Sequence, residues 1–232
     1  MTQRMLHISS PLFVRESKLS NTAIEQLFPH PQPLVLEIGC GIGDFIVQLA
    51  AANPTNNYLA IDIFNKGCLK TCRRVEKAGL DNVRVMRIEA RYLLSRYLKA
   101  DSLAAVYVNC PDPWPKKRHR YRRLINAEFM QQLLYVLRPN GDFFFSTDFT
   151  DYAEQVAELL PQLDAWCNQL PAPSTTDLPG YPISKYMRRF LDLGQPIHFV
   201  HYRKRKDLPA GSIVKPLLRH GFRTVQKHID HA

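Results

Sequence analysis

Short apolar segments alternate with segments of helical spacing along most of this chain, and this alternation limits the possible folds more than any other feature. LVLEIG (34–39) and LAAVYVN (103–109) are almost continuously apolar, which is typical of strands buried on both faces of a parallel sheet. The same reasoning predicts strands at 57–62, 83–90 and 142–148, and helices at 43–54, 65–79, 90–99, 123–141 and 152–163. Since strand and helix alternate five times, we predict an α/β protein with a doubly wound, Rossmann-like, mostly parallel sheet.

The remaining segments predict the domain organisation. PIHFVHYRK (196–204) alternates in polarity and predicts a late antiparallel strand. We therefore divide the chain into an N-terminal arm (1–33), one α/β domain (34–204) and a basic C-terminal tail (205–232) with a short helix near 213–220. A length of 232 residues suits one sizeable domain and is too short for two ordinary ones.

The positive charge is concentrated in two places. The net charge is +10, and residues 113–123 and 201–232 each sum to +6, so the rest of the chain sums to about −2. Such patches suit a polyanion, whereas the rival interpretations are a solvated surface or an anionic membrane surface. No apolar run approaches the roughly 18 residues of a membrane span, and no signal peptide is evident, so we expect a cytoplasmic protein without a membrane segment.

The five cysteines indicate no metal site. Cys68 and Cys72 are four residues apart, which places them on one helix face, but no second Cys or His pair completes a zinc site. We expect the cysteines to be small buried side chains in a reducing compartment.

A glycine-rich loop follows the first predicted strand. Glu37 is followed by Gly39, Gly41 and Gly43, at the point where the first helix opens. Glycines there let backbone amides approach a ligand at the carboxyl end of the sheet. Dehydrogenases usually space these glycines as G-x-G-x-x-G, whereas the alternating pattern after an acid resembles the cofactor loop of S-adenosylmethionine-dependent methyltransferases.

Two further acids end the next two strands. Asp62 lies 21 residues after Gly41, where a carboxylate can accept hydrogen bonds from both ribose hydroxyls of an adenosine ligand. Glu89 ends the third strand and could meet the adenine edge. The alternative is that these acids cap helices or turns.

The stretch PDPWPKKRHRYRR (111–123) follows the fourth strand. Its prolines stiffen the loop and present Asp112 and Trp114 at the sheet edge where ligands bind. Trp114 is either a stacking face for a base or a packing anchor. The cations predict phosphate contacts, against the alternative of a solvated helix start, and they are Lys116, Lys117, Arg118, Arg120, Arg122 and Arg123. Asp148 ends the fifth strand at the same edge, either within the site or beside a helix N-cap.

Together these residues resemble the bacterial, single-chain tRNA (guanine-N7-)-methyltransferase family over about residues 34–203, most specifically in Pro-Asp-Pro-Trp followed by a basic run. The resemblance implies a class I S-adenosylmethionine-dependent methyltransferase fold, S-adenosylmethionine as cofactor and tRNA as partner. It implies cofactor contacts from Glu37, Asp62, Glu89 and Asp112, with Asp112 also the active-site acid. Lys116 and Asp148 would contact the RNA, and a segment that includes Ser184 and Lys185 would complete the substrate site.

The sequence departs from the family pattern in places. Met187 stands where the family has Glu, and a thioether neither accepts strong hydrogen bonds nor carries charge. Ser184 replaces Thr, Glu89 stands for the usual Asp, and Asn109-Cys110 precede Pro111 where the family often has Phe.

The reaction that the resemblance implies is methyl transfer to N7 of a guanosine in the tRNA variable loop (position 46). We expect the protein to be a monomer or homodimer. The alternatives are an RNA-binding protein of this fold that has altered or lost catalysis, and a methyltransferase acting on another RNA, a protein or a small molecule. The basic patches argue against a small molecule, and the glycine spacing argues against a dehydrogenase.

Overall fold

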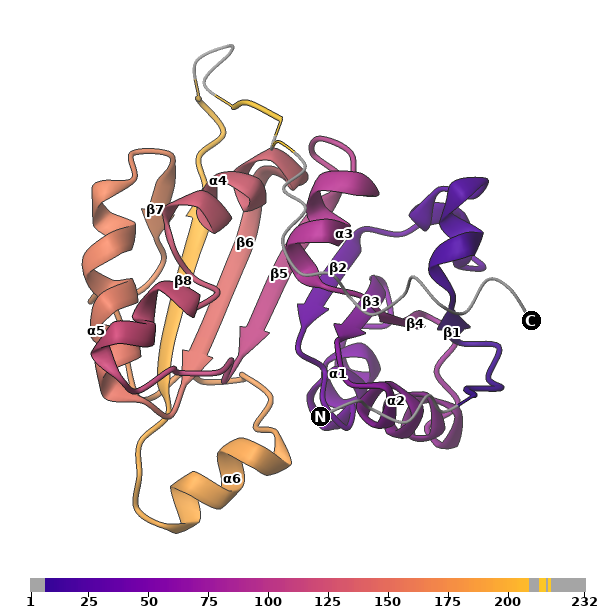
Figure 1. Ribbon diagram of the computed structural model, residues 1–232, viewed down its shortest axis with the longest axis horizontal. Helices are drawn as coiled ribbons and strands as arrows, with labels where there is room; N and C mark the ends of the chain where they lie inside the picture. Colours follow the sequence, from indigo (N-terminus) through magenta and orange to yellow (C-terminus); the bar gives the residue numbers. More distant parts are fainter. Residues whose placement is uncertain (1–6, 209–212, 216, 218–232) are drawn as a thin grey trace.

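The computed structural model describes residues 7–208, 213–215 and 217, which form an eight-stranded sheet with helices on both faces (Figure 1). The strands are β1 (Phe13–Val14), β2 (Leu34–Ile38), β3 (Asn57–Asp62), β4 (Val83–Arg87), β5 (Leu103–Asn109), β6 (Leu137–Thr147), β7 (Trp166–Asn168) and β8 (His198–Lys204). The α-helices are α1 (Asp44–Ala52), α2 (Asn65–Lys77), α3 (Ala90–Arg96), α4 (Ala127–Val136), α5 (Thr150–Leu159) and α6 (Lys185–Asp192). Short 3-10 helices are η1 (Glu16–Ser20), η2 (Ile24–Leu27), η3 (Lys117–Arg122) and η4 (Leu160–Gln162).

The strand order β1-β4-β3-β2-β5-β6-β8-β7 confirms the predicted doubly wound sheet. The pairs from β1 to β6 are parallel, and β8 is antiparallel to both β6 and β7, which confirms the late antiparallel strand. The chain winds outward from β2 to β4 and then returns to β5 on the other side of β2. This reversal is a topological switch point, where such sheets bind ligands at their carboxyl edge. In Figure 1 the arrowheads of β5 and β6 point to this edge, where α6 lies.

Two apolar layers cover the sheet. One contains α1 and α2 and packs Phe45 and Val75 against Val35 and Val85. The other contains α3, α4 and α5 and includes Phe129. The strands between them are buried on both faces, which is why their sequences are almost continuously apolar.

The described part of the N-terminal arm packs on the edge of the sheet. Phe13 and Val14 pair in parallel with β4, and Ile24 and Leu27 are buried in the layer that contains α3. β1 is a strand that the sequence pattern did not predict. The domain boundary at residue 33 stays a prediction. The predicted helix near 213–220 lies largely outside the described residues, as does most of the basic tail.

The predicted helix over 123–141 was wrong at both ends. The helix begins only after Asn126, whose side chain accepts a hydrogen bond from Phe129 N at 3.0 Å. It ends at Val136, because β6 begins at Leu137 and contains the Pro139-Asn140-Gly141 sequence. Asn140 there has φ 60°, and the pairing with β5 shifts register between Leu103 and Ala105. The Pro-Asn-Gly sequence therefore forms an irregularity within a strand.

Cysteine burial follows the prediction in part. Cys40, Cys68 and Cys72 are buried, the last two on the face of α2 that packs on the sheet, whereas Cys167 is exposed. Within the described residues, no helix is long and apolar enough to cross a membrane.

We expect Lys204→Met to lower the free energy of unfolding by about 2–4 kcal/mol. Lys204 is 2% exposed, and its Nζ donates to Asp101 Oδ1 at 2.7 Å and to the carbonyl oxygens of Leu134 and Leu137 at 2.8 and 2.6 Å. Methionine fills a similar volume but leaves these acceptors unpaired. Urea denaturation measures the difference, with Lys206→Met, at an exposed position, as the matched control. Equal stabilities of the two variants would contradict this role.

Candidate active site

The glycine loop forms an open cradle after β2. Gly39, Gly41 and Gly43 have φ 81°, 54° and 79°. Glycine adopts this left-handed backbone conformation freely, whereas a residue with a side chain would be strained in it. The amides of Gly39 and Cys40 both donate to Ile61 O, at 2.8 and 3.0 Å. A Cβ atom added at Gly39 would meet nothing within 4 Å, so the space above the loop is open to a ligand.

Asp62 holds this loop in place. Its Oδ2 accepts from Gly41 N and its Oδ1 accepts from Phe64 N, both at 2.8 Å. Burial raises the pKa of Asp62, and these backbone hydrogen bonds oppose the shift. The side chain therefore performs the turn-forming role that was the alternative in the sequence analysis. Each carboxylate oxygen has a second lone pair, so acceptors remain for ribose hydroxyls.

Two residues that the sequence analysis missed support the loop from α2. A Cβ atom added at Gly67 would lie 2.6 Å from the carbonyl oxygen of Gly41, and one added at Gly43 would lie 2.7 Å from Thr71 Cγ2. Thr71 Oγ1 donates to Gly41 O at 3.2 Å. Gly67 lies within α2, and glycine in a helix costs about 1 kcal/mol relative to Ala. A glycine at such a position indicates that another segment of backbone approaches closely, and this signal was available in the sequence.

Glu89 caps a helix at the end of β4. Its Oε2 accepts from Tyr92 N at 2.9 Å, so the capping role that was weighed for this acid is observed. The amide of Ile88 donates to Asp62 O at 3.1 Å, which places Glu89 beside the end of β3. Asp62 and Glu89 therefore lie at neighbouring positions on the carboxyl edge.

Glu37 is a buried acid below the loop. It is 1% exposed, and among the described residues its Oε2 has no hydrogen-bond partner. Burial raises its pKa to about 8, the nearby Asn109 side chain opposes the shift, and the charges of Asp62 and Asp44 add to it. A buried carboxyl without a partner is costly, so the atom fits a ligand group that donates a hydrogen bond or carries positive charge.

The loop after β5 carries backbone strain. Cys110 and Trp114 both have φ 43°, which is uncommon for residues with side chains, and each directly precedes a proline. Cys110 N donates to Ser146 O at 2.8 Å, which ties the start of the loop to β6. Between the two strained residues Asp112 is exposed, and its charge raises the pKa of Asp62. Strain of this kind is concentrated at functional sites.

Trp114 is a partly exposed ring with two neighbours of its own loop. The Arg122 guanidinium lies 4.8 Å from its centroid, and the His119 ring meets it edge-on at 5.9 Å. Trp114 thus packs within its own loop, where the Arg122 guanidinium stacks on it, and it also keeps an exposed part that a base could contact. The structure is consistent with both a packing anchor and a stacking face.

The basic run divides into exposed and internal cations. Lys116, Lys117, Arg118 and Arg122 are exposed around η3, and they are available to a polyanion. Arg120 is half-buried and pairs with Asp151.

Arg123 is a correction to the sequence analysis, because its guanidinium cannot reach a phosphate. Its side chain is 0% exposed. It donates to Pro113 O at 2.7 Å, to Asp151 Oδ2 at 2.5 Å and to Gln155 Oε1 at 2.6 Å. It also lies 4.7 Å from the ring centroid of Tyr152. Arg123 thus fastens the Pro-Asp-Pro-Trp loop to α5, a role that a Lys/Arg count does not distinguish from phosphate binding.

The segment before α6 closes the same edge of the sheet. Ser184 is the N-cap of α6 and accepts from Met187 N at 3.2 Å, while Lys185 N donates to Asp44 Oδ2 at 2.5 Å. After burial, the charge of Asp148 is the largest cause that raises the pKa of Tyr186, to about 12, and Asp112 also contributes. Asp148, Asp112 and the exposed Tyr186 therefore lie near one another.

Met187 lies in an apolar cluster. It is 0% exposed and packs with Ile197, Phe199 and the partly buried Cys110. Two of the positions where the sequence departs from the family pattern, Met187 and Cys110, therefore belong to one cluster. Methionine anchors α6 there by burial, and the position supplies no charge.

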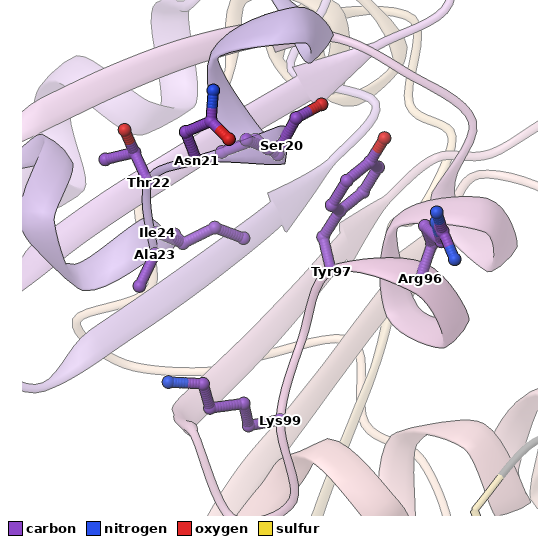
Figure 2. Close-up of a pocket in the computed structure, with 9 residues that line it drawn as sticks. Ser20, Asn21, Thr22, Ala23, Ile24, Arg96, Tyr97 and Lys99 are labelled. Atoms are coloured by element: carbon purple, nitrogen blue, oxygen red, sulfur yellow. The ribbon is translucent and has the colours of Figure 1, made fainter.

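A separate surface pocket of about 360 Å³ lies at the opposite edge of the sheet (Figure 2). Residues around η1 and η2 line it together with Arg96, Tyr97 and Lys99, which precede β5. The pocket contains none of the predicted site residues. No group of three or more His, Cys, Asp or Glu side chains in the described part of the chain could hold a metal ion.

Comparison with known proteins places this fold and site in one class. A family model described as "Putative methyltransferase" matches residues 31–200. Among solved structures, the 16S rRNA methyltransferase KamB superimposes with a TM-score of 0.56 at 17% identity, covering 75% of this chain and 88% of that one. TrmN from Thermus thermophilus superimposes with a TM-score of 0.52 at 19% identity, covering 75% and 45%. The chain has the fold of the S-adenosylmethionine-dependent methyltransferases, as predicted.

Curated relatives define the family more narrowly. A tRNA (guanine-N(7)-)-methyltransferase of Syntrophotalea carbinolica is 56% identical over 225 residues, which is 97% of each chain. One from Geobacter metallireducens is 52% identical over 207 residues, 88% of this chain and 98% of the relative. The chain belongs to the tRNA (guanine-N(7)-)-methyltransferase family.

We expect Glu37→Gln to flatten the decline of stability with rising pH. The pKa of Glu37 in the folded protein, about 8, lies above its ordinary value of 4.5, so its contribution is complete below pH 4.5 and is lost as pH rises towards 8. Between pH 5.5 and 7.5 the wild type should lose about 2 kcal/mol more than Glu37→Gln, at up to 1.4 kcal/mol per pH unit. Urea denaturation at both pH values checks this. Parallel declines would show that Glu37 does not titrate in this range.

Proposed function

We propose that this protein transfers a methyl group from S-adenosylmethionine to N7 of a guanosine in the tRNA variable loop, at position 46. One observation supports this most directly. A glycine cradle with three acids at successive strand ends lies on the same sheet edge as an exposed carboxylate, Asp112, whose loop continues into a run of exposed cations that begins at Lys116. Adenosine-ligand groups and RNA-binding groups thus share one edge. We place the activity in the cytoplasm, and the prediction of a monomer or homodimer stays a prediction.

The residues at this edge fit the cofactor. The unpaired Glu37 Oε2 suits a cationic amino group, and the open space above Gly39 suits a ligand that approaches the backbone. Asp62 keeps free lone pairs for ribose hydroxyls, and Glu89 lies beside it at the next strand end. When bound, S-adenosylmethionine supplies a methyl group that its sulfonium activates for transfer.

The protein mainly has to position the two reactants. Guanine N7 has an available lone pair at neutral pH, so no general base is required, and correct placement can supply up to ~7–11 kcal/mol of the barrier. Asp112 is presented by a loop whose prolines and buried Arg123 limit its movement. Its carboxylate can accept from the guanine N1–H and N2–H groups and stabilise the positive charge that develops on the ring.

The exposed cations give the RNA affinity. Lys116, Lys117, Arg118 and Arg122 face solvent and can contact phosphates without regard to base sequence. Asp148, Ser184 and Lys185 lie where the carboxyl edge meets α6 and would contact the nucleoside. Trp114 would contact a base with the part of its ring that remains exposed.

An RNA-binding protein that has lost catalysis is the second candidate, and Met187 favours it. The side chain is buried in an apolar cluster, so the carboxylate of the family pattern is missing from this edge. Methyl transfer from radiolabelled S-adenosylmethionine to unmodified tRNA transcripts separates the two candidates. Aniline cleavage at the variable-loop guanosine would support the proposal, whereas binding of tRNA and cofactor without transfer would support the second candidate.

We expect Asp112→Asn to reduce single-turnover methyl transfer by about 100- to 1,000-fold, because the amide cannot stabilise a cationic purine as a carboxylate does. Asp112 is exposed and the substitution keeps its shape, so tRNA affinity should change less than about threefold. Rapid-quench assays at saturating tRNA measure transfer, and filter binding measures affinity. A variant that loses affinity but transfers normally once bound would contradict the catalytic role.

We expect Lys117→Ala combined with Arg118→Ala to weaken tRNA binding and to reduce the slope of log K against log salt by about 1.4–1.8, since each exposed phosphate contact contributes about 0.7–0.9. The control removes two exposed cations from α2, Arg73→Ala with Lys77→Ala, and should leave the slope unchanged. A loss of slope in the control pair alone would place the RNA surface on α2.

A further inference from the structure

Residues 178–187, here called the strap, connect the sheet edge to α6 and are fastened to α1. Gln48 Nε2 donates to Ile183 O at 3.2 Å, and Lys185 N donates to Asp44 Oδ2 at 2.5 Å. Because α1 follows the glycine loop directly, the strap is attached to the same helix that begins at the cofactor cradle. Its far end is held by the buried Met187.

Tyr181 is the strap's anchor in the sheet. Its ring packs against Phe45 and Phe199 with centroid distances of 5.3 and 5.1 Å. Its hydroxyl donates to Asn109 Oδ1 at 2.6 Å. Asn109 is the last residue of β5, so this bond joins the strap to the strand end that leads into the Pro-Asp-Pro-Trp loop.

Asn109 is oriented by two donors. Its Oδ1 also accepts from Ser146 Oγ at 2.9 Å, so the amide oxygen is held by β6 and the strap together. The amide nitrogen Nδ2 is buried and, within the described chain, has no hydrogen-bond partner.

The unpaired amide lies beside the unpaired acid. Glu37 pairs with Tyr107 in the register of β2 and β5, and Asn109 is two residues farther along β5, so its side chain lies on the same sheet face. The Asn109 amide favours the ionised form of Glu37, whose Oε2 is unpaired. One donor and one acceptor thus lie together, each incompletely satisfied, beneath the glycine loop. A cationic ligand group would complete this arrangement, because it favours the ionised form of the acid, and an ionised carboxylate is a stronger acceptor for the neighbouring amide.

We propose that Tyr181 is a positioning residue that acts through Asn109 to hold the Glu37 carboxyl towards the cationic amino group of the bound cofactor, and so links the seating of the strap to cofactor affinity. This inference rests on the proposed function. It links the substrate-side segment to the cofactor acid through one tyrosine, which is hydrogen-bonded to one asparagine whose unpaired amide lies beside that acid.

The test uses calorimetric titration of S-adenosylmethionine into the full-length protein without tRNA. Tyr181→Phe keeps the ring packing and removes the donor to Asn109, so we expect about tenfold weaker binding. Tyr107→Phe is the matched control. Its ring packs against the same Tyr181 ring at 6.0 Å, its hydroxyl makes no hydrogen bond to Asn109, and its affinity should stay within twofold of the wild type.

A double-mutant cycle distinguishes positioning from a general structural role. If Tyr181 acts through Glu37, then adding Tyr181→Phe to Glu37→Gln should cause little further loss of affinity, whereas independent effects would multiply. In steady-state assays Tyr181→Phe should raise KM for S-adenosylmethionine and leave KM for tRNA unchanged. Ser146→Ala removes the second donor to Asn109 from within β6 and should weaken cofactor binding in the same direction, which keeps the test available if Tyr181→Phe does not fold.

Two outcomes would overturn the inference while leaving the proposed function intact. In one, the wild type binds S-adenosylmethionine and Tyr181→Phe and Ser146→Ala bind it equally well. In the other, the losses in the double-mutant cycle multiply. A wild-type protein that does not bind S-adenosylmethionine at all would overturn the proposed function itself, and the inference with it.

Discussion

Parallel pairing of β2 with both β3 and β5 is the constraint on which the rest of this molecule depends. Parallel strands end at the same edge, so Glu37, Asp62 and Asn109, far apart in sequence, are brought together there. The loops at that edge need special backbone conformations, which glycine adopts freely in the cofactor cradle and which cost strain at Cys110 and Trp114. The hydrogen bonds from Gly41 N to Asp62 and from Cys110 N to Ser146 O are what hold these conformations in place.

The arginine-rich segment shows how one kind of side chain takes opposite roles within a few residues. Arg118 is exposed and free to meet a polyanion, whereas Arg123 is buried and satisfied by Asp151, Gln155 and a backbone carbonyl. The buried cation makes the exposed ones effective, because it fastens their loop to α5. The same run of charged residues therefore contains both the cations that face solvent and the buried cation that holds their loop in place.

Two of the departures from the family pattern lie side by side in the folded chain. Met187 and Cys110 belong to one apolar cluster, so α6 is seated by burial where the family pattern has a charged group. A polar contact across this edge is made instead by Tyr181, which donates to Asn109, the residue that lies beside Glu37. On this proposal, the strap as a whole, and not residue 187 alone, links the substrate-side segment to cofactor affinity.

The sequence by itself determined the alternation of elements, the parallel sheet with its late antiparallel strand, the glycine loop and the acids at strand ends, because hydrophobic period and glycine placement are local signals. It did not determine the strand identity of Pro139-Asn140-Gly141 or the burial of Arg123, since the β5 register and the Asp151 partner are tertiary contacts. The start of α4 depends on a local cap, from Phe129 N to Asn126, and this signal in the sequence was missed. Gly67, Asn109 and Tyr181 gained their roles only when distant segments met. Whether a polar group faces solvent or a partner depends on which chain segment packs over it, and that is decided by the folded structure.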